Sequence, residues 1–315
     1  MRSDRRARVI GAAAVVAIAG GLALRYARRQ ERPGAPLDAG SASAPAVTTV
    51  ARGEIEALAS GELGVLAVGK GGLVLRLRRG GDWQRDTPAK VDLHGVAQQL
   101  DEAVAVGDDG TILELDHDAW RAAPRATDHA LRAVAYTTYG AIAVGDGGVI
   151  VRRAAPGEPW RVEPSPTTSD LHGACAGLRD VWIVGRGVIV FHAPLTDLGN
   201  PWKLQPSPTP ATLRAVACDG DHAAAAVGDG GAMIERLDDV GWHESPSGTQ
   251  RDLFAVAAPL GTRSWLVVGA GGVALRESGS PAPLATGVSF DLRAATDGAL
   301  GTFLAGAGGV VRVTP

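Results

Sequence analysis

The sequence predicts an all-β fold built from short antiparallel strands, and three observations support this prediction. From residue 51 onward the chain repeats itself about every 40 residues. Each repeat contains short segments rich in Val and Ile that are separated by glycine turns, a pattern typical of strands. The 315 residues include 43 Gly and 19 Pro, and both residue types weaken the interior of a helix, which disfavours a helical bundle.

One motif recurs in every repeat: a strand of small apolar residues that runs into a glycine turn, as in AVGDGG and VVGAGG. The first glycine of this turn is Gly69, Gly107, Gly145, Gly185, Gly228, Gly269 or Gly306. An apolar segment precedes each turn and starts at Ile55, Leu93, Leu131, Leu171, Leu213, Leu253 or Leu292. A third segment follows the turn, and a tryptophan marks a fourth segment in five repeats, at Trp83, Trp120, Trp160, Trp202 and Trp242. Each repeat therefore predicts four short strands.

Seven such units predict a seven-bladed β-propeller, because a sheet of short apolar strands needs a neighbour on each face. The chain ends directly after the third strand of the seventh unit. Residues 44–50 lie just before the first unit, where a fourth strand is due. We therefore expect the N-terminal strand to close the last blade, so that the propeller spans residues 44–315 and leaves no open sheet edge at the seam.

The segment before the propeller has the character of an export signal. Residues 1–32 contain eight arginines against Asp4 and Glu31, and they flank an uncharged stretch at residues 9–24. This length lies between a signal-peptide core and a membrane-spanning helix. We predict an N-terminal hydrophobic helix that acts as a signal anchor or transmembrane segment within residues 1–32. A cleaved signal and a fortuitous apolar stretch are the alternatives. Residues 33–43 are predicted to be a flexible linker.

These features predict a membrane-anchored protein whose propeller lies on the extracytoplasmic side, periplasmic or lumenal. The net charge of the whole chain is −3. Because the first 32 residues are strongly basic, the propeller itself is acidic, which argues against nucleic-acid binding. The seven histidines show no metal-ligand spacing and no phosphate-binding loop is present. No metal, cofactor or enzymatic activity is therefore predicted.

Two cysteines cannot form a disulfide framework or a four-thiolate zinc site. Cys175 and Cys218 fall in the first strands of neighbouring units, four and five residues after Leu171 and Leu213. Side chains one position apart point to opposite faces of a strand. This difference favours two buried thiols over a disulfide.

The pattern Leu-x-x-Val, then Ala-Val-Gly-Asp-Gly-Gly-x-Ile-x-Arg, then Trp resembles the Ycf48/HCF136 type of propeller, which is related to the BNR (Asp-box) repeats. The resemblance covers residues 51–315. It implies a seven-bladed, exported, non-catalytic propeller that binds other proteins, since the family includes a photosystem II assembly factor. The Asp-Gly-Gly-x-x-Trp stretch of the family is degraded in this sequence, for example to APGEPW.

The candidate binding site is a set of basic side chains that follow the leading leucine of the first strand. First strands are innermost in a propeller, so these residues are expected to form a partial ring around a central funnel suited to an acidic peptide or a carboxylate. The predicted ring is His94, Arg132, His172, Arg214 and Arg293. The alternative is a structural role, in which Arg132 and Arg214 pair with Asp146 and Asp229 in their own blades. Arg293 has Ala307 in that turn and is the best candidate for a free cation.

Two further features have competing interpretations. Loops rich in Pro, Ser and Thr at 163–170, 205–212 and 244–252 suit either a contact surface or rigid connectors on the same face as the ring. The repeated tryptophans are predicted to pack between the outer strands of adjacent blades; the alternative is a set that stacks on sugars.

These observations predict a non-catalytic, membrane-tethered, exported propeller that acts as a protein-interaction or assembly scaffold. Its partner is expected to be a protein such as a membrane-protein complex. The alternative is a glycan-binding or glycan-hydrolysing propeller of the BNR/sialidase type, and a third option is a solute-binding propeller. A funnel pocket in which Arg, Tyr and carboxylate side chains converge would favour the glycan alternative.

Overall fold

A computed structural model describes residues 46–177, 180–192, 202–220, 223–237, 241–258 and 264–314. These residues belong to one compact unit, Ala44–Pro315. The signal anchor predicted within residues 1–32 and the linker predicted at 33–43 lie outside the described residues.

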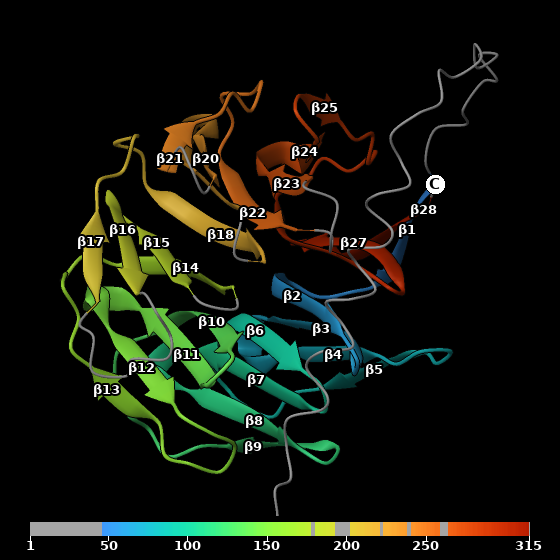
Figure 1. Ribbon diagram of the computed structural model, residues 1–315. Helices are drawn as coiled ribbons and strands as arrows, with labels where there is room; N and C mark the ends of the chain where they lie inside the picture. The colour runs from blue at the N-terminus through green and yellow to red at the C-terminus, as the bar shows by residue number, and fades with distance from the viewer. Residues whose placement is uncertain are drawn as a thin grey trace, which may run out of the picture. The chain divides into compact units, whose positions relative to one another are not determined.

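The described strands form seven four-stranded antiparallel sheets (Figure 1). The first sheet contains β2 (Ile55–Gly61), β3 (Gly64–Gly69), β4 (Val74–Leu77) and β5 (Trp83–Asp86). The second contains β6 (Leu93–Gln99), β7 (Glu102–Gly107), β8 (Ile112–Asp116) and β9 (Ala119–Ala122). The third contains β10 (Leu131–Thr137), β11 (Gly140–Gly145), β12 (Ile150–Arg153) and β13 (Arg161–Glu163). The first strand of every sheet begins at the residue predicted from the repeats.

The next three sheets keep this order. They contain β14 (Leu171–Ala176), β15 (Val181–Gly185), β16 (Val188–His192) and β17 (Lys203–Gln205); then β18 (Leu213–Asp219), β19 (Ala223–Gly228), β20 (Met233–Leu237) and β21 (Gly241–Glu244); then β22 (Leu253–Ala257), β23 (Trp265–Gly269), β24 (Ala274–Glu277) and β25 (Pro281–Pro283).

The last sheet joins the two ends of the propeller. It contains β26 (Leu292–Gly298), β27 (Gly301–Gly306) and β28 (Gly309–Thr314), and its outermost strand is β1 (Ala46–Ala51). β1 lies beside β28 (Figure 1). The two strands are antiparallel, with Val47 opposite Val313 and Thr49 opposite Val311. This pairing confirms that residues before the first repeat close the seam. It supplies β28 with the neighbour that it would otherwise lack.

The sheets form a closed ring through their first strands. Neighbouring first strands contact one another in the order β2, β6, β10, β14, β18, β22 and β26, and β26 contacts β2. Seven apolar clusters fill the spaces between neighbouring sheets. The cluster at the seam joins Ile55 and Val65 of the first sheet to Phe303 and Val310 of the last. Each fully buried side chain of this kind contributes about 1.5–3 kcal/mol to the stability of the fold. Because the buried side chains lie in seven clusters, this stabilisation is distributed over seven interfaces.

The tryptophans belong to these interfaces. Trp160 and Trp202 are less than a tenth exposed and lie in the clusters that join the third sheet to its two neighbours. Trp83 meets Phe303 edge-to-face, with ring centroids 6.1 Å apart. Trp242 meets Trp182 in the same way at 5.3 Å. The packing interpretation is confirmed, because each of these large rings fills space between two sheets.

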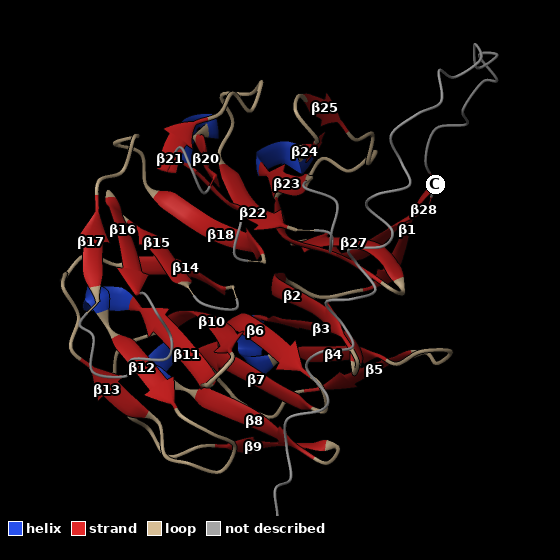
Figure 2. Cartoon of the chain, in the orientation of Figure 1, coloured by secondary structure: helices blue, strands red, loops and turns tan. Residues whose placement is uncertain are grey.

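The N-terminal hydrophobic helix of the predicted fold class is not found among the described residues. The helical structure in the described part of the chain consists of five one-turn 3₁₀ segments (Figure 2). They are η1 (Lys70–Gly72), η2 (Asp108–Gly110), η3 (Asp146–Gly148), η4 (Asp229–Gly231) and η5 (Ala270–Gly272). None of the described helices has the length and apolar character that crossing a membrane requires. The apolar stretch at residues 9–24 lies outside the described residues.

The glycines of the turn motif let two chain segments approach closely. A Cβ atom on Gly145 would lie 2.0 Å from the carbonyl oxygen of Ala130, so no other residue fits there without displacement. Gly147 has φ of +68°, which glycine adopts at low cost. Its N–H donates to Asp170 Oδ1 of the next sheet at 2.9 Å. The same bond between sheets recurs from Gly71 to Asp92, from Gly230 to Asp252 and from Gly271 to Asp291.

Cys175 and Cys218 form a disulfide with a Cα–Cα distance of 5.7 Å, so the prediction of two thiols is wrong. Cys175 lies on β14 and Cys218 on β18, the first strands of neighbouring sheets. In a ring of equivalent sheets, one face of each sheet packs against the opposite face of the next sheet. Two side chains that meet across an interface must therefore point to opposite faces of their own sheets. The difference of one position between the two cysteines is what brings them together.

Replacing both cysteines with alanine is expected to lower the free energy of unfolding by about 3–4 kcal/mol, because the bond closes a long loop in the unfolded chain. Denaturant unfolding of the oxidised protein and the variant measures this difference. Reduced wild-type protein should match the variant, and the variant itself should not respond to reductant. Equal midpoints for oxidised wild type and variant would contradict the expectation.

Two carboxyl groups face each other between the fifth and sixth sheets. Burial, followed by repulsion from Glu277, raises the pKa of Glu235, and His243 opposes this only in part. Glu277 is 6% exposed. A carboxyl whose pKa is higher in the folded state than in the unfolded state binds its proton more tightly when folded. Its contribution to stability is full at pH values below the unfolded pKa and is lost as the pH rises through the folded pKa.

The variant Glu235→Gln is therefore expected to be more stable than wild type at pH 7 and to lose less stability between pH 4 and pH 8. Thermal unfolding across this pH range tests the expectation. Glu244→Gln, at an exposed position on the following strand, is the matched control and should reproduce the wild-type profile. A Glu235→Gln profile as steep as that of wild type would show that the carboxyl pair is not responsible.

Candidate functional site

The second residue of each first strand contributes to one cavity. These residues are Glu56, His94, Arg132, His172, Arg214, Phe254 and Arg293, and with Asp146 and Asp170 they line a volume of 390 Å³. We call the seven residues the funnel ring. All five predicted site residues belong to it. Glu56 and Phe254 stand at the same position of the repeat, but neither is basic, so the predicted ring did not include them.

The antiparallel topology explains why charged turns meet the ring. The second strand returns to the end of the sheet at which the first strand begins, so each 3₁₀ turn lies beside the ring residue of its own sheet. Arg132 donates from Nε to Asp146 Oδ1 at 2.8 Å and from Nη2 to Oδ2 at 2.6 Å. Arg214 Nε donates to Asp229 Oδ1. The structural alternative, pairing within one blade, is therefore confirmed for both arginines.

His94 links two neighbouring blades. Its Nε2 lies 2.7 Å from Asp108 Oδ1 of its own sheet and 2.9 Å from Arg132 Nη1 of the next sheet. The bidentate bond from Arg132 holds the pKa of Asp146 below its usual range and raises that of Arg132 itself. This part of the funnel ring is therefore a network of paired charges rather than a set of open cations.

Arg293 is not a free cation, which corrects the prediction. Its Nη1 lies 3.4 Å from Glu56 Oε2, and its guanidinium lies 5.6 Å from the centre of the Phe254 ring. Closure of the ring places β26 beside β2, so Arg293 meets the carboxylate of the first sheet. Arg214 lies 5.5 Å from the same Phe254 ring. One aromatic side chain thus holds two guanidinium groups by cation–π contacts.

The accessible positive charge of the funnel ring lies on two arginines. The side chains of Arg214 and Arg293 are 41% and 44% exposed, whereas that of Arg132 is 32% exposed. Burial, as the largest effect, lowers the pKa of His172, which favours a neutral imidazole at pH 7. The ring can therefore offer two partly screened guanidinium groups and a neutral imidazole to a carboxylate or another anionic group.

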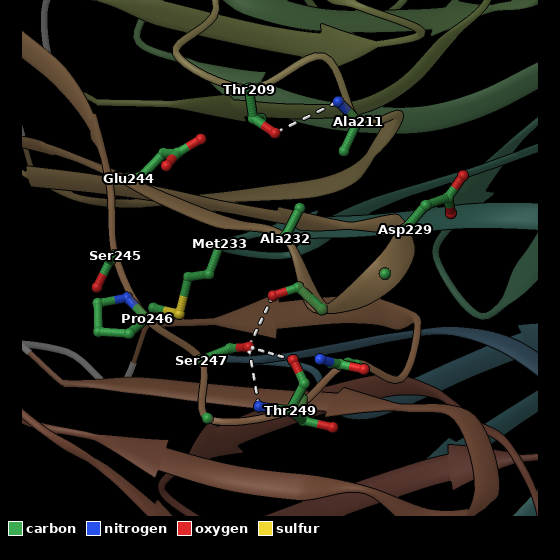
Figure 3. A pocket seen from close by; sticks show the side chains of 14 residues that line it. Thr209, Ala211, Asp229, Ala232, Met233, Glu244, Ser245, Pro246, Ser247 and Thr249 are labelled. Carbon is green, nitrogen blue, oxygen red and sulfur yellow. Dashed lines mark hydrogen bonds between the residues drawn. The ribbon is translucent and has the colours of Figure 1, made fainter.

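A larger groove has a volume of 850 Å³ (Figure 3). It meets the funnel ring at one ion pair, because Asp229 lines the groove and bonds to Arg214, which lines the funnel. Its lining includes η4, which contains the Arg214 partner Asp229, and residues 244–250. Ser247 Oγ donates to the carbonyl of Gly231 at 2.7 Å, and Thr249 N donates to Ser247 Oγ at 3.4 Å. The loop at 244–252 is therefore an internally bonded connector that also lines the groove, together with Thr209 and Ala211 of the loop at 205–212.

The described residues contain no group of three or more His, Cys, Asp or Glu side chains placed to hold a metal ion. The funnel cavity also has no tyrosine in its described lining. The combination of Arg, Tyr and carboxylate that would favour a glycan site is therefore not found in the funnel.

No protein-family model and no curated protein matches the chain. Solved structures match it strongly. The structure of YCF48 bound to D1 peptide has a TM-score of 0.68 at 15% identity over 88% of this chain and 96% of that chain. YCF48 from Cyanidioschyzon merolae has a TM-score of 0.66 at 18% identity, with 85% and 98% covered. The WD40 repeats of RRP9 have a TM-score of 0.70 at 12% identity, with 86% and 99% covered. The chain thus has a Ycf48-like propeller fold.

We expect the ring nitrogens of His172 to titrate below the ordinary range of histidine, because burial disfavours the charged imidazolium. Arg214 adds to this effect, whereas Asp170 and Asp146 oppose it. Histidine NMR titration measures the pKa directly. In Arg214→Met the His172 pKa should rise, since a positive neighbour has been removed. A wild-type pKa at or above the ordinary value would contradict the expectation.

Proposed function

We propose that this protein is a non-catalytic interaction scaffold that binds a partner protein across the face carrying the funnel ring and the adjoining groove. The observation that carries the proposal is the funnel ring itself. Each of the seven sheets contributes one funnel-ring side chain to a single cavity. Its two most exposed ring arginines, Arg214 and Arg293, contact the same aromatic ring. Such an arrangement is suited to a carboxylate at the end of a peptide or on an acidic side chain.

The groove beside Asp229 extends this surface outward. A peptide with its carboxylate near Arg214 could continue over η4 and residues 244–250, which line the groove. A propeller of the same fold, YCF48, has been solved with a peptide bound, which supports a peptide-binding role for this chain. By analogy with YCF48-type assembly factors, we propose that the partner is a protein that is being assembled into a complex. Membrane-protein complexes are the first candidates.

The disulfide supports an extracytoplasmic location for the propeller. Structural disulfides persist in oxidising compartments and are rare in the cytosol. The bond between Cys175 and Cys218 joins two sheets, so a reducing compartment would remove a cross-link of the ring. We propose that the protein works in a periplasmic or lumenal compartment.

The test uses a fluorescent peptide that ends in two acidic residues and a free carboxylate, with its C-terminal amide as the paired probe. We expect fluorescence anisotropy to show binding of the free acid that weakens as salt is added. Arg214→Glu combined with Arg293→Glu should abolish this binding, because both accessible guanidinium groups become carboxylates. Arg132 stays unchanged, since it is the least exposed of the three ring arginines and is bonded to both carboxylate oxygens of Asp146.

The matched control is a charge reversal of equal size at exposed outer positions, Arg85→Glu with Arg161→Glu. It should bind the peptide as wild type does. Circular dichroism and thermal unfolding confirm that both variants are folded. Equal binding by the ring variant and the outer variant would refute the assignment of the site to the funnel ring.

A further inference from the structure

A narrower cavity continues from the funnel ring along the axis of the propeller. It has a volume of 190 Å³, and all seven funnel-ring residues line it as well as the funnel. The rest of its lining consists of the next two residues of each first strand. We call this cavity the shaft. A ligand that is held at the funnel ring therefore stands at the entrance of the shaft.

A β-bulge separates the ring from the shaft in every sheet. In the third sheet the register shifts between Leu131 and Ala133, so Arg132 has no pairing partner on β11. The same shift falls at the ring residue of the other six first strands. A bulge interrupts the ladder and redirects the side chains around it. The ring residues thus stand apart from the regularly paired residues that form the shaft.

The described walls of the shaft carry no charged or polar side chain. Below the ring, each lining residue is glycine, alanine, valine or leucine. Six of them are half-buried although they lie on the innermost strands: Ala57, Leu58, Ala133, Ala174, Ala215 and Ala255. A charged group that entered the shaft would leave water without gaining a partner there. An apolar group would instead remove its own apolar surface and that of the walls from water.

Two of the seven sheets make the shaft wider than the others do. At the fourth position of the first strand, five sheets carry a leucine or a valine: Leu58, Val96, Val134, Val216 and Val256. The other two carry Ala174 and Ala295. On the second strands these alanines pair with Ile183 and Leu304, which are fully buried in the apolar clusters between sheets. The core is therefore filled from the second strand, and the two alanines leave space in the shaft.

The entrance of the shaft combines charge with an aromatic surface. Phe254 lines both cavities and contacts the guanidinium groups of Arg214 and Arg293. A carboxylate that binds these arginines has the rest of its molecule beside an aromatic ring and above an apolar shaft. The two cavities together therefore match a ligand whose carboxylate stands next to an apolar group.

The backbone around the shaft favours a peptide among such ligands. Each first strand is an edge strand of its own sheet, so the backbone N–H and C=O groups on its inner side have no strand partner. The end of a peptide brings N–H and C=O groups of its own, whereas an alkyl carboxylate brings no N–H.

We propose that the shaft receives the apolar side chain of the last residue of a bound peptide, while the terminal carboxylate stays at Arg214 and Arg293. This inference rests on the proposed function. It narrows the partner to a protein with an accessible C-terminus that ends in an apolar residue such as leucine.

Three fluorescent peptides that share one sequence and end in leucine, alanine or glycine test this inference on the full-length protein. Fluorescence anisotropy should show that the leucine peptide binds at least about tenfold more tightly than the glycine peptide, with the alanine peptide between them. Added salt should weaken the binding of all three but leave their ratio unchanged, because the burial of an apolar side chain is not screened. The amide of the leucine peptide should bind more weakly than its free acid.

Ala174→Val narrows the shaft without changing the ring. The variant carries the residue that four other sheets already have at this position, so the propeller should still fold, which circular dichroism and thermal unfolding check. It should weaken binding of the leucine peptide by about fivefold or more, since added methyl groups crowd a filled site, and leave the glycine peptide unaffected. Ala119→Val, at an exposed position on β9, is the matched control and should bind all three peptides as wild type does.

Equal affinity of wild type for the three peptides would overturn the inference. If the leucine free acid still bound more tightly than its amide, the carboxylate site at the funnel ring would stand. Absence of binding by every free acid would overturn both the inference and the proposed function. The inference would also fail if octanoate bound more tightly than the leucine peptide, or if Ala174→Val kept the full preference for leucine. The comparison of peptides on wild-type protein does not depend on the folding of the variant.

Discussion

Everything in the propeller depends on the antiparallel pairing of β1 with β28. The seven first strands enclose a central cavity only because the last sheet stands next to the first, and β1 completes that last sheet. The pairing also explains individual contacts. Arg293 meets Glu56 across the seam, and the apolar cluster of Ile55 and Phe303 is assembled there. A chain whose ends did not pair would leave β28 with an open edge and would lose the contacts that Val47, Val50 and Ala51 make with the apolar clusters on the two sides of the last sheet.

The ring geometry turns a repeated sequence into two different chemical surfaces. At one end of the sheets, the second residue of each first strand comes to the funnel ring beside the charged 3₁₀ turns, as with Arg132 and Asp146. At the other end, residues of the third strands meet between sheets, as with Glu114 and Arg153. Neither surface is repeated faithfully around the ring. We therefore propose that binding specificity arises from the differences between repeats, such as Phe254 in place of a basic residue.

Most charges on the funnel face have partners, so the site is not a set of free cations. Each of the three ring arginines is paired with a carboxylate: Arg132 with Asp146, Arg214 with Asp229 and Arg293 with Glu56. A ligand must therefore compete with the paired carboxylate for each guanidinium group, or bind the guanidinium N–H donors that the carboxylate does not use. Such a site favours a ligand that adds several weak contacts over a wide area. The groove next to Asp229 supplies that area.

The sequence by itself determined the strands, their order and the strand that closes the seam, because strand periodicity, glycine turns and repeat spacing are local properties. It also placed His94, Arg132, His172, Arg214 and Arg293 at one position of the repeat. Only the tertiary structure decided which side chains meet. Cys175 reaches Cys218 because stacked sheets oppose unlike faces, and Arg293 finds Glu56 because the ring closes. Contacts between sheets depend on the packing of segments far apart in the chain, and no local pattern records that packing.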